Sequence, residues 1–254
     1  MDFETITVES NNAVGLITLN RPASMNAVCA AMLYELAQAV SDFDAEESIR
    51  VIVLKGESDF FAAGTDMSEF ASSQNDSFAK NSVYTRAAET IARCRKPIIT
   101  GAAGYVFGGG LELVLMSDIV IAADNARFGF PEITLGVLPQ MGGAALLAGR
   151  VGRAKAMDIL LTGRHISAEE ALACGLVSRV VDGADLLNEV GETAERVASM
   201  PAAGVKLAKQ AVLRACCVRS ETEETIARLS LASADAQEGL TALKENRAPK
   251  YVHK

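Results

Sequence analysis

The amino-acid sequence predicts an α/β fold. Before about Met141, apolar runs of strand length alternate with stretches of helical periodicity, which is the order typical of this class. Residues 51–54 (VIVL) form a continuous apolar run of the kind that is buried on both faces of a sheet. A glycine-rich bend then joins a strand at residues 98–100 to a helix that contains Glu112.

The remaining elements before Met141 follow from local patterns. Residues 5–9 alternate polar and apolar side chains and residues 14–19 are mostly apolar, which predicts two strands. Asn26 is a candidate N-cap for the next helix. The apolar side chains of that helix share one face: Met32, Leu33, Leu36, Val40 and Phe43. The polar stretch at residues 71–82 predicts a loop, and residues 119–122 predict a strand.

Helical patterns dominate beyond Met141. We expect helices at residues 152–161 and 167–174, the second with a Ser167/Glu170 capping box and Gly175 as its stop signal. A short strand at 177–181 precedes a helix at about 184–198. From Pro201 the pattern is helical to the end, with a second capping box at Ser220 and Glu223. We therefore divide the chain into residues 1–198, which carry the site, and a helical region at 199–254.

Composition limits the function classes. The chain has 254 residues, half of them hydrophobic, so a substantial core is expected. Its net charge of −8 argues against a nucleic-acid partner, since phosphate binding needs a basic face. The one stretch long enough to span a membrane, residues 97–123, contains Glu112, Asp118 and three consecutive glycines, which disfavour a lipid-exposed helix.

The cysteines and the N-terminus indicate a cytoplasmic protein. Five cysteines without CxxC spacing, and only two histidines, do not make a zinc cluster. We expect reduced thiols at Cys29, Cys94, Cys174, Cys216 and Cys217. The first residues are acidic where a signal or transit peptide needs basic ones.

Two glutamates stand in apolar surroundings. Glu112 lies in the run Leu111 to Met116, and Glu132 follows Phe130 and Pro131. Burying an ionised carboxylate costs several kcal/mol unless it is paired, or else its pKa rises until it holds a proton near neutral pH. The two glutamates are therefore candidates for an acid and base pair. The alternative is that each is a satisfied core residue or faces water.

Several familiar chemistries lack their motifs. The sequence contains no GxSxG, no P-loop and no GxGxxG. The glycines at 108–110 precede a helix, where uncovered backbone N–H groups can stabilise a developing oxyanion. A plain tight bend is the alternative.

A series of motifs resembles the enoyl-CoA hydratase/isomerase (crotonase) family in order and spacing. The motifs are Leu19-Asn20-Arg21-Pro22 with Asn26-Ala27, Phe61-Ala62-Ala63-Gly64-Thr65-Asp66, residues 104–112 (GYVFGGGLE), Phe128-Gly129-Phe130-Pro131-Glu132 with Leu135-Gly136, and Gly142-Gly143. Later segments at 152–163, 171–177 and 238–251 continue the match.

The resemblance implies a fold, a substrate and residue roles. The fold would be a spiral of β-β-α repeats, with residues 199–254 used for trimerisation and two trimers commonly stacked. The substrate would be an acyl-coenzyme A thioester of the kind met in fatty-acid β-oxidation, with no separate cofactor. The backbone N–H groups of Thr65 and Gly109 would form an oxyanion hole. Glu112 would activate water and Glu132 would protonate C2.

Further positions are assigned to substrate binding by the same resemblance: Ala63, Asp66, Gly108, Pro131, Leu135, Gln140, Lys250 and Tyr251. Three positions depart from the common pattern. Gln140 stands where hydratases often have glycine, and Ala23 and Ser68 stand where many relatives carry lysines near the coenzyme A phosphates. Lys250 beside Tyr251 could compensate, from the same or an adjacent subunit.

Three functions remain open. The first is a 2-enoyl-CoA hydratase, which the presence of both glutamates favours. The second is another reaction through the same enolate, such as double-bond isomerisation, which Gln140 suggests. The third is a non-catalytic binding protein on this fold.

Overall fold

Two β-sheets organise the chain in a computed structural model, which describes residues 3–72, 83–216, 232 and 234–250. The first sheet has the strand order β1-β2-β3-β5-β7-β10. Its strands are β1 (Ile6–Asn11), β2 (Val14–Leu19), β3 (Val51–Lys55), β5 (Ile98–Ala102), β7 (Ile119–Ala123) and β10 (Arg179–Val181). Only the β1–β2 pair is antiparallel in this sheet as described.

A second, smaller sheet has the strand order β4-β6-β8-β9. Its strands are β4 (Phe60–Ala62), β6 (Tyr105–Phe107), β8 (Arg127–Gly129) and β9 (Ile166–Ser167). Three successive turns of chain each give one strand to the large sheet and the next strand to the small one: β3 then β4, β5 then β6, and β7 then β8. This repetition is the spiral of β-β-α turns that the resemblance implies.

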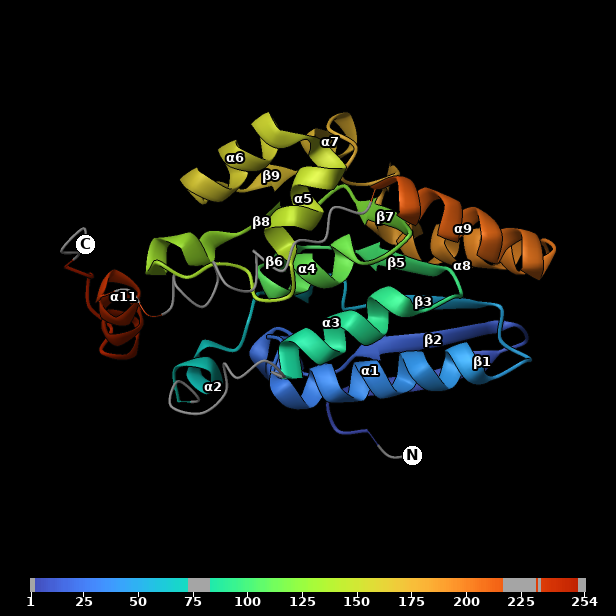
Figure 1. Cartoon of the computed structure of the whole chain (residues 1–254), viewed down its shortest axis with the longest axis horizontal. Helices are drawn as coiled ribbons and strands as arrows, with labels where there is room; N and C mark the ends of the chain where they lie inside the picture. The colour runs from blue at the N-terminus through green and yellow to red at the C-terminus, as the bar shows by residue number, and fades with distance from the viewer. Residues whose placement is uncertain (1–2, 73–82, 217–231, 233, 251–254) are drawn as a thin grey trace.

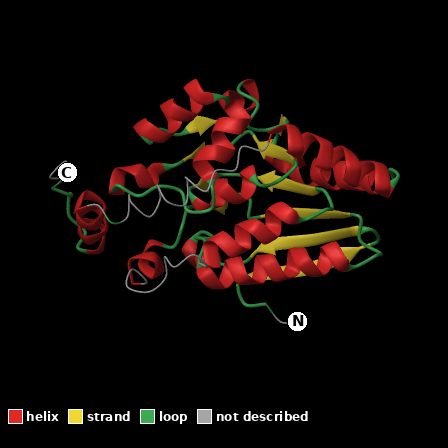
Figure 2. Cartoon of the chain, viewed as in Figure 1, coloured by secondary structure: helices red, strands yellow, loops and turns green. Residues whose placement is uncertain are grey.

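Helices cover the strands of both sheets (Figures 1 and 2). They are α1 (Ala30–Ala45), α2 (Met67–Ser72), α3 (Val83–Arg93), α4 (Gly109–Leu115), α5 (Gly143–Val151), α6 (Arg153–Thr162), α7 (Ala168–Ala173), α8 (Leu186–Ala198), α9 (Ala202–Cys216) and α11 (Ala234–Lys244), with 3₁₀ turns η1 (Pro22–Ser24), η2 (Pro131–Leu135) and η3 (Gly183–Asp185). Within the described chain, α11 lies apart from α9 and packs against η2 and α2.

The large sheet is buried on both faces. Ile52 and Leu54 of β3 belong to the main core, which includes the apolar face of α1, whereas Val51 and Val53 pack with Leu186 of α8. The continuous apolar run at 51–54 therefore predicted its doubly buried position correctly. The face of α1 was also correct, because the five apolar residues expected to share it are buried.

Some local expectations were wrong. Asn26 does not cap α1, because Cys29 is the N-cap and its Sγ accepts from the N–H of Met32 at 3.5 Å. The sequence did not predict the strands β4, β6, β8 and β9 or the helices α3 and α5. The strand expected at 177–181 spans only Arg179–Val181. The first two residues of the loop expected at 71–82 are helical, since α2 extends to Ser72. Residues 73–82 and the Ser220/Glu223 box lie outside the described residues.

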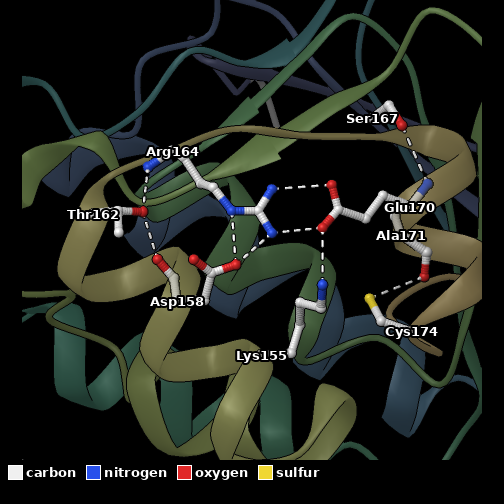
Figure 3. Close-up of polar contacts among 8 residues, drawn as sticks. All are labelled: Lys155, Asp158, Thr162, Arg164, Ser167, Glu170, Ala171 and Cys174. Atoms are coloured by element: carbon white, nitrogen blue, oxygen red, sulfur yellow. Dashed lines mark hydrogen bonds and ion pairs between the residues drawn. The ribbon is translucent and has the colours of Figure 1, made fainter.

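The helix α7 begins as expected but with half of the expected capping box. Ser167 Oγ accepts from the N–H of Glu170 at 3.1 Å, and Gly175 follows the helix at φ +78°. The carboxylate of Glu170 instead binds Lys155 and Arg164, and Arg164 also binds Asp158 (Figure 3). This ion cluster ties α6 to α7, on either side of β9.

Two further sequence expectations concern the chain as a whole. The cysteines with described side chains, at 29, 94 and 174, are free thiols. Across the residues that the structure describes, no helix combines the length and the apolar character needed to cross a membrane.

Candidate active site

Glu112 lies in the first turn of α4 and is 1% exposed. The helix begins immediately after Gly108, whose φ of +46° and ψ of −122° suit glycine, because a side chain rarely adopts a positive φ. This sharp turn at the end of β6 directs α4 back across the core and carries the Glu112 carboxylate into it. The carboxylate predicted from the apolar run is therefore buried, as expected.

Three backbone N–H groups hold the Glu112 carboxylate. The N–H groups of Met141 and Gly143 donate to Oε1 at 2.6 and 2.8 Å, and that of Gln140 donates to Oε2 at 3.3 Å. They converge because Gly142, at φ +93°, turns the chain into α5, whose first N–H groups have no acceptor within the helix. We call these donors the amide cradle. Sequence reasoning missed it, although Gly142-Gly143 before a helix was the signal.

Gln140 contributes to the site through its backbone. Its side-chain amide donates to the carbonyl of Leu138 at 2.5 Å, and its backbone N–H faces Glu112. The departure from glycine at this position thus leaves the N–H contact to Glu112 in place.

Glu132 lies beside the same turn. It belongs to the first turn of η2, directly after Pro131, and is partly buried. The strands β6 and β8 run parallel, with Phe107 opposite Gly129, so both glutamates follow the same end of the small sheet. A Cβ atom on Gly108 would lie 3.2 Å from Glu132 Oε2, which shows how closely the backbone before α4 borders this carboxyl group.

Burial perturbs both carboxyl groups. Desolvation, together with repulsion from Glu132, raises the pKa of Glu112 to about 8, while the amide cradle opposes the shift. Desolvation raises the pKa of Glu132 to about 7. Because the two groups are coupled, the pair titrates as a unit. Near neutral pH, the pair therefore holds about one proton for two carboxyl groups.

Thr65 and Gly109 bring two free backbone donors together. Thr65 forms a parallel bridge with Val28, and Gly109 is the first residue of α4. A Cβ atom on Gly109 would lie 3.0 Å from Thr65 Oγ1, so the two residues are adjacent. Among the described residues, neither N–H donates to a protein acceptor. Two adjacent free donors, one of them at a helix N-terminus, are suited to bind an oxyanion.

The other residues assigned to substrate binding are placed as follows. The N–H of Ala63 donates to the carbonyl of Met25, and Asp66 binds Arg21 and Ser68. Although partial burial pushes the pKa of Asp66 up, the hydrogen bonds from Ser68 and Arg21 hold it below its ordinary value. Asp66 is thus engaged by protein partners.

Two further candidates contact α11: Leu135 from η2, and Lys250 from the segment that follows the helix. Leu135 packs with Val137 and Leu240, and a Cβ atom on Gly239 would meet the Leu135 carbonyl oxygen at 2.4 Å. Lys250 is exposed, and its backbone N–H donates to Glu238 at 2.7 Å. Tyr251 lies outside the described residues.

Comparison with known proteins shows which family the chain resembles in sequence and in fold. Residues 9–254 match the enoyl-CoA hydratase/isomerase family model. The chain is 43% identical to a probable enoyl-CoA hydratase of Mycobacterium bovis, over all of both chains. It superposes with a TM-score of 0.86 on an enoyl-CoA hydratase/isomerase of Pseudoalteromonas atlantica, at 32% identity over 98% of this chain and 100% of that one. A methylmalonyl-CoA decarboxylase in complex with 2-nitronate-propionyl-CoA gives a TM-score of 0.89 at 27% identity over both chains. The chain therefore belongs to the enoyl-CoA hydratase/isomerase (crotonase) family.

Proposed function

We propose that this protein adds water across the C2=C3 bond of a 2-enoyl-CoA thioester to give a 3-hydroxyacyl-CoA. The observation that carries the proposal is a pair of coupled carboxyl groups, Glu112 buried and Glu132 partly buried, beside two free backbone N–H donors. The curated relatives named as enoyl-CoA hydratases support it.

The two backbone donors supply the oxyanion hole of the proposed reaction. When water attacks C3, negative charge moves onto the thioester oxygen as an enolate. The N–H groups of Thr65 and Gly109 would bind that oxygen, and a donor of this kind typically contributes about 3 to 4 kcal/mol in the transition state. Neither donor is a side chain, so threonine serves at position 65 as well as another residue would.

The two glutamates supply the proton transfers. Glu112 Oε1 already accepts two bonds from the amide cradle, whereas among the described residues Oε2 accepts only the longer bond from Gln140. Oε2 is therefore the oxygen left to bind water and take its proton. Glu132 would deliver the proton to C2. The reaction needs Glu112 ionised and the shared proton on Glu132. Desolvation gives Glu112 the higher pKa of the two, but the three N–H groups of the amide cradle stabilise its ionised form and so favour the arrangement that the reaction needs.

The pH dependence of turnover follows from the raised pKa values. Below about pH 7 the pair takes up its second proton and loses its base, and above about pH 8 it loses its last proton and its acid. We expect kcat/KM to be bell-shaped, with its maximum between these limits. Initial rates in constant-ionic-strength buffers test this. A profile limited only by a group near the ordinary glutamate pKa of 4.5 would contradict it.

Crotonyl-CoA provides the direct assay. Hydration removes the conjugated chromophore, so the wild-type protein should cause a catalytic loss of its ultraviolet absorbance, with 3-hydroxybutyryl-CoA as the product. A 3-enoyl thioester run beside it tests the alternative of double-bond isomerisation. Conversion of the 3-enoyl thioester to the 2-enoyl thioester, without hydration of crotonyl-CoA, would reject the hydratase proposal.

The family fold supports other reactions as well, as the similarity to a methylmalonyl-CoA decarboxylase indicates. Both carboxyl groups favour hydration over isomerisation in this chain. They also count against a non-catalytic role, since burying the Glu112 carboxyl group beside a second acid would cost stability without serving a reaction.

The proposal extends to the assembly, the compartment and the coenzyme A contacts. We propose a homotrimer, or a hexamer of two trimers, in the cytoplasm. Exposed apolar side chains on α6 and α9, which suit contact with another subunit, support the assembly: Met157, Leu161, Leu207 and Val212. Lys250 and Tyr251 are the proposed contacts for the coenzyme A moiety in place of lysines at Ala23 and Ser68.

A further inference from the structure

The turn between β2 and α1 is fastened to the segment that carries Thr65. Four hydrogen bonds join residues 25–28 to residues 61–66. Asn26 Nδ2 donates to the carbonyl of Phe61 at 3.1 Å, and the N–H of Ala63 donates to the carbonyl of Met25 at 3.0 Å. The N–H of Val28 donates to the carbonyl of Gly64, and the N–H of Asp66 donates to the carbonyl of Val28, both at 2.8 Å. Thr65 lies between the last two bonds, so the direction of its free N–H depends on this ladder.

Arg21 closes the end of the ladder. Its Nη1 donates to the carbonyl of Ala27 at 2.5 Å, and its Nη2 binds Asp66 Oδ2 at 3.1 Å. Ala27 and Asp66 are the neighbours of Val28 and Thr65, the two bridged residues. The planar guanidinium fork suits this task, because it can reach a carbonyl and a carboxylate at once. Arg21 therefore connects the two bridged segments beside the oxyanion donor.

The turn between β2 and α1 has an unfavourable backbone conformation, which these hydrogen bonds stabilise. Met25 and Asn26 both have left-handed backbones, at φ +47° and +54°, and Met is poorly suited to that conformation. Asn26 is fully buried, and its Oδ1 accepts from the N–H of Arg21 at 2.7 Å. Arg21 thus holds the turn through its backbone and its side chain together.

We propose that Arg21 is a positioning residue for the oxyanion hole: with Asp66 as its partner, it sets the direction of the Thr65 N–H. The inference rests on the proposed function, since it assigns Thr65 to the thioester oxygen. It also gives Asp66 a role in the protein framework in place of a substrate contact. The competing role for Arg21 is binding of a coenzyme A phosphate, because Ala23 is only two residues away and carries no charge.

Arg21→Gln separates these roles when two thioesters are compared. We expect kcat on crotonyl-CoA to fall about tenfold or more, with KM changed by less than about threefold, because a misdirected donor weakens transition-state binding. Crotonyl-pantetheine, which lacks the nucleotide phosphates, should show the same fold loss. A loss confined to the coenzyme A ester would overturn the proposal in favour of a phosphate contact.

Arg95→Gln is the matched control. Arg95 also binds a carboxylate and a carbonyl, those of Asp44, but at the opposite end of α1. Its replacement should leave turnover within about twofold of wild type, as expected for a surface ion pair. Asp66→Asn, which keeps the side-chain size, should lower kcat in the same direction as Arg21→Gln and provides a second variant if the first fails to fold.

The carbonyl stretch of bound butyryl-CoA gives a readout that does not depend on turnover. This saturated thioester cannot be hydrated, and the oxyanion hole should shift its carbonyl band to lower frequency. We expect a smaller shift in Arg21→Gln and Asp66→Asn than in wild type and Arg95→Gln. An unchanged shift in both site variants would overturn the inference. Absence of hydration by the wild-type protein would instead reject the proposed function.

Discussion

Replacing Glu112 with Gln is expected to lower turnover of crotonyl-CoA by about 10²-fold or more. Glutamine keeps an oxygen for the amide cradle but cannot take a proton from water. Glu132→Gln should cause a loss of similar size, because no acid would remain to protonate C2. The double variant should be little worse than either single one, since the two groups act as a unit. Initial rates of absorbance loss measure all three.

Glu35→Gln is the matched control for these variants. The Glu35 carboxylate is also held by backbone N–H groups, but these belong to Glu4 and Thr5, before β1, and not to the amide cradle. It should retain wild-type turnover. Thermal unfolding of each variant shows whether the fold is intact. Wild-type turnover in the Glu112→Gln protein would remove Glu112 from the mechanism.

Gly143→Ala is expected to lower turnover by about 10²-fold, because a small misplacement of a catalytic group has that effect. The added Cβ would lie 2.8 Å from Glu112 Cγ and 2.9 Å from Glu112 Oε1. Either the carboxylate or the start of α5 must therefore move, and the amide cradle opens. Steady-state kinetics should show the loss mainly in kcat.

Gly149→Ala, in the same helix, controls for the change of residue type. A Cβ atom there would meet nothing within 4 Å. We expect wild-type turnover and a free energy of unfolding that is about 0.5 to 1 kcal/mol higher, because alanine is favoured over glycine inside a helix. Full activity in Gly143→Ala would show that the amide cradle does not position Glu112.

The parts of the fold that sequence predicted are those with a strong periodic signal. The run at 51–54 and the apolar face of α1 are long enough for their burial to be decided by pattern alone. The strands β4, β6, β8 and β9 have only two or three residues each, so no alternation could reveal them. Asn26 was misassigned because a cap and a left-handed turn both favour asparagine.

In the site, too, sequence predicted the residue with a strong local signal and missed the contacts that form only on folding. Glu112 stood out because an acid in an apolar run is costly, whereas its role and that of Glu132 came from the family resemblance. The amide cradle consists of backbone N–H groups, which every residue except proline has, so residue types did not reveal it. The role of Arg21 depends on contacts with Ala27 and Asp66 that form only in the folded chain.

Isotope incorporation during turnover of crotonyl-CoA tests the proposed chemistry most directly. In water enriched in ¹⁸O, the wild-type product should carry one solvent oxygen at C3, and in D₂O it should carry one deuterium at C2. Both labels should appear at rates lowered about 10²-fold in Glu112→Gln and Glu132→Gln. A wild-type product without solvent oxygen, or labelling that does not depend on the two glutamates, would contradict hydration by this carboxyl pair.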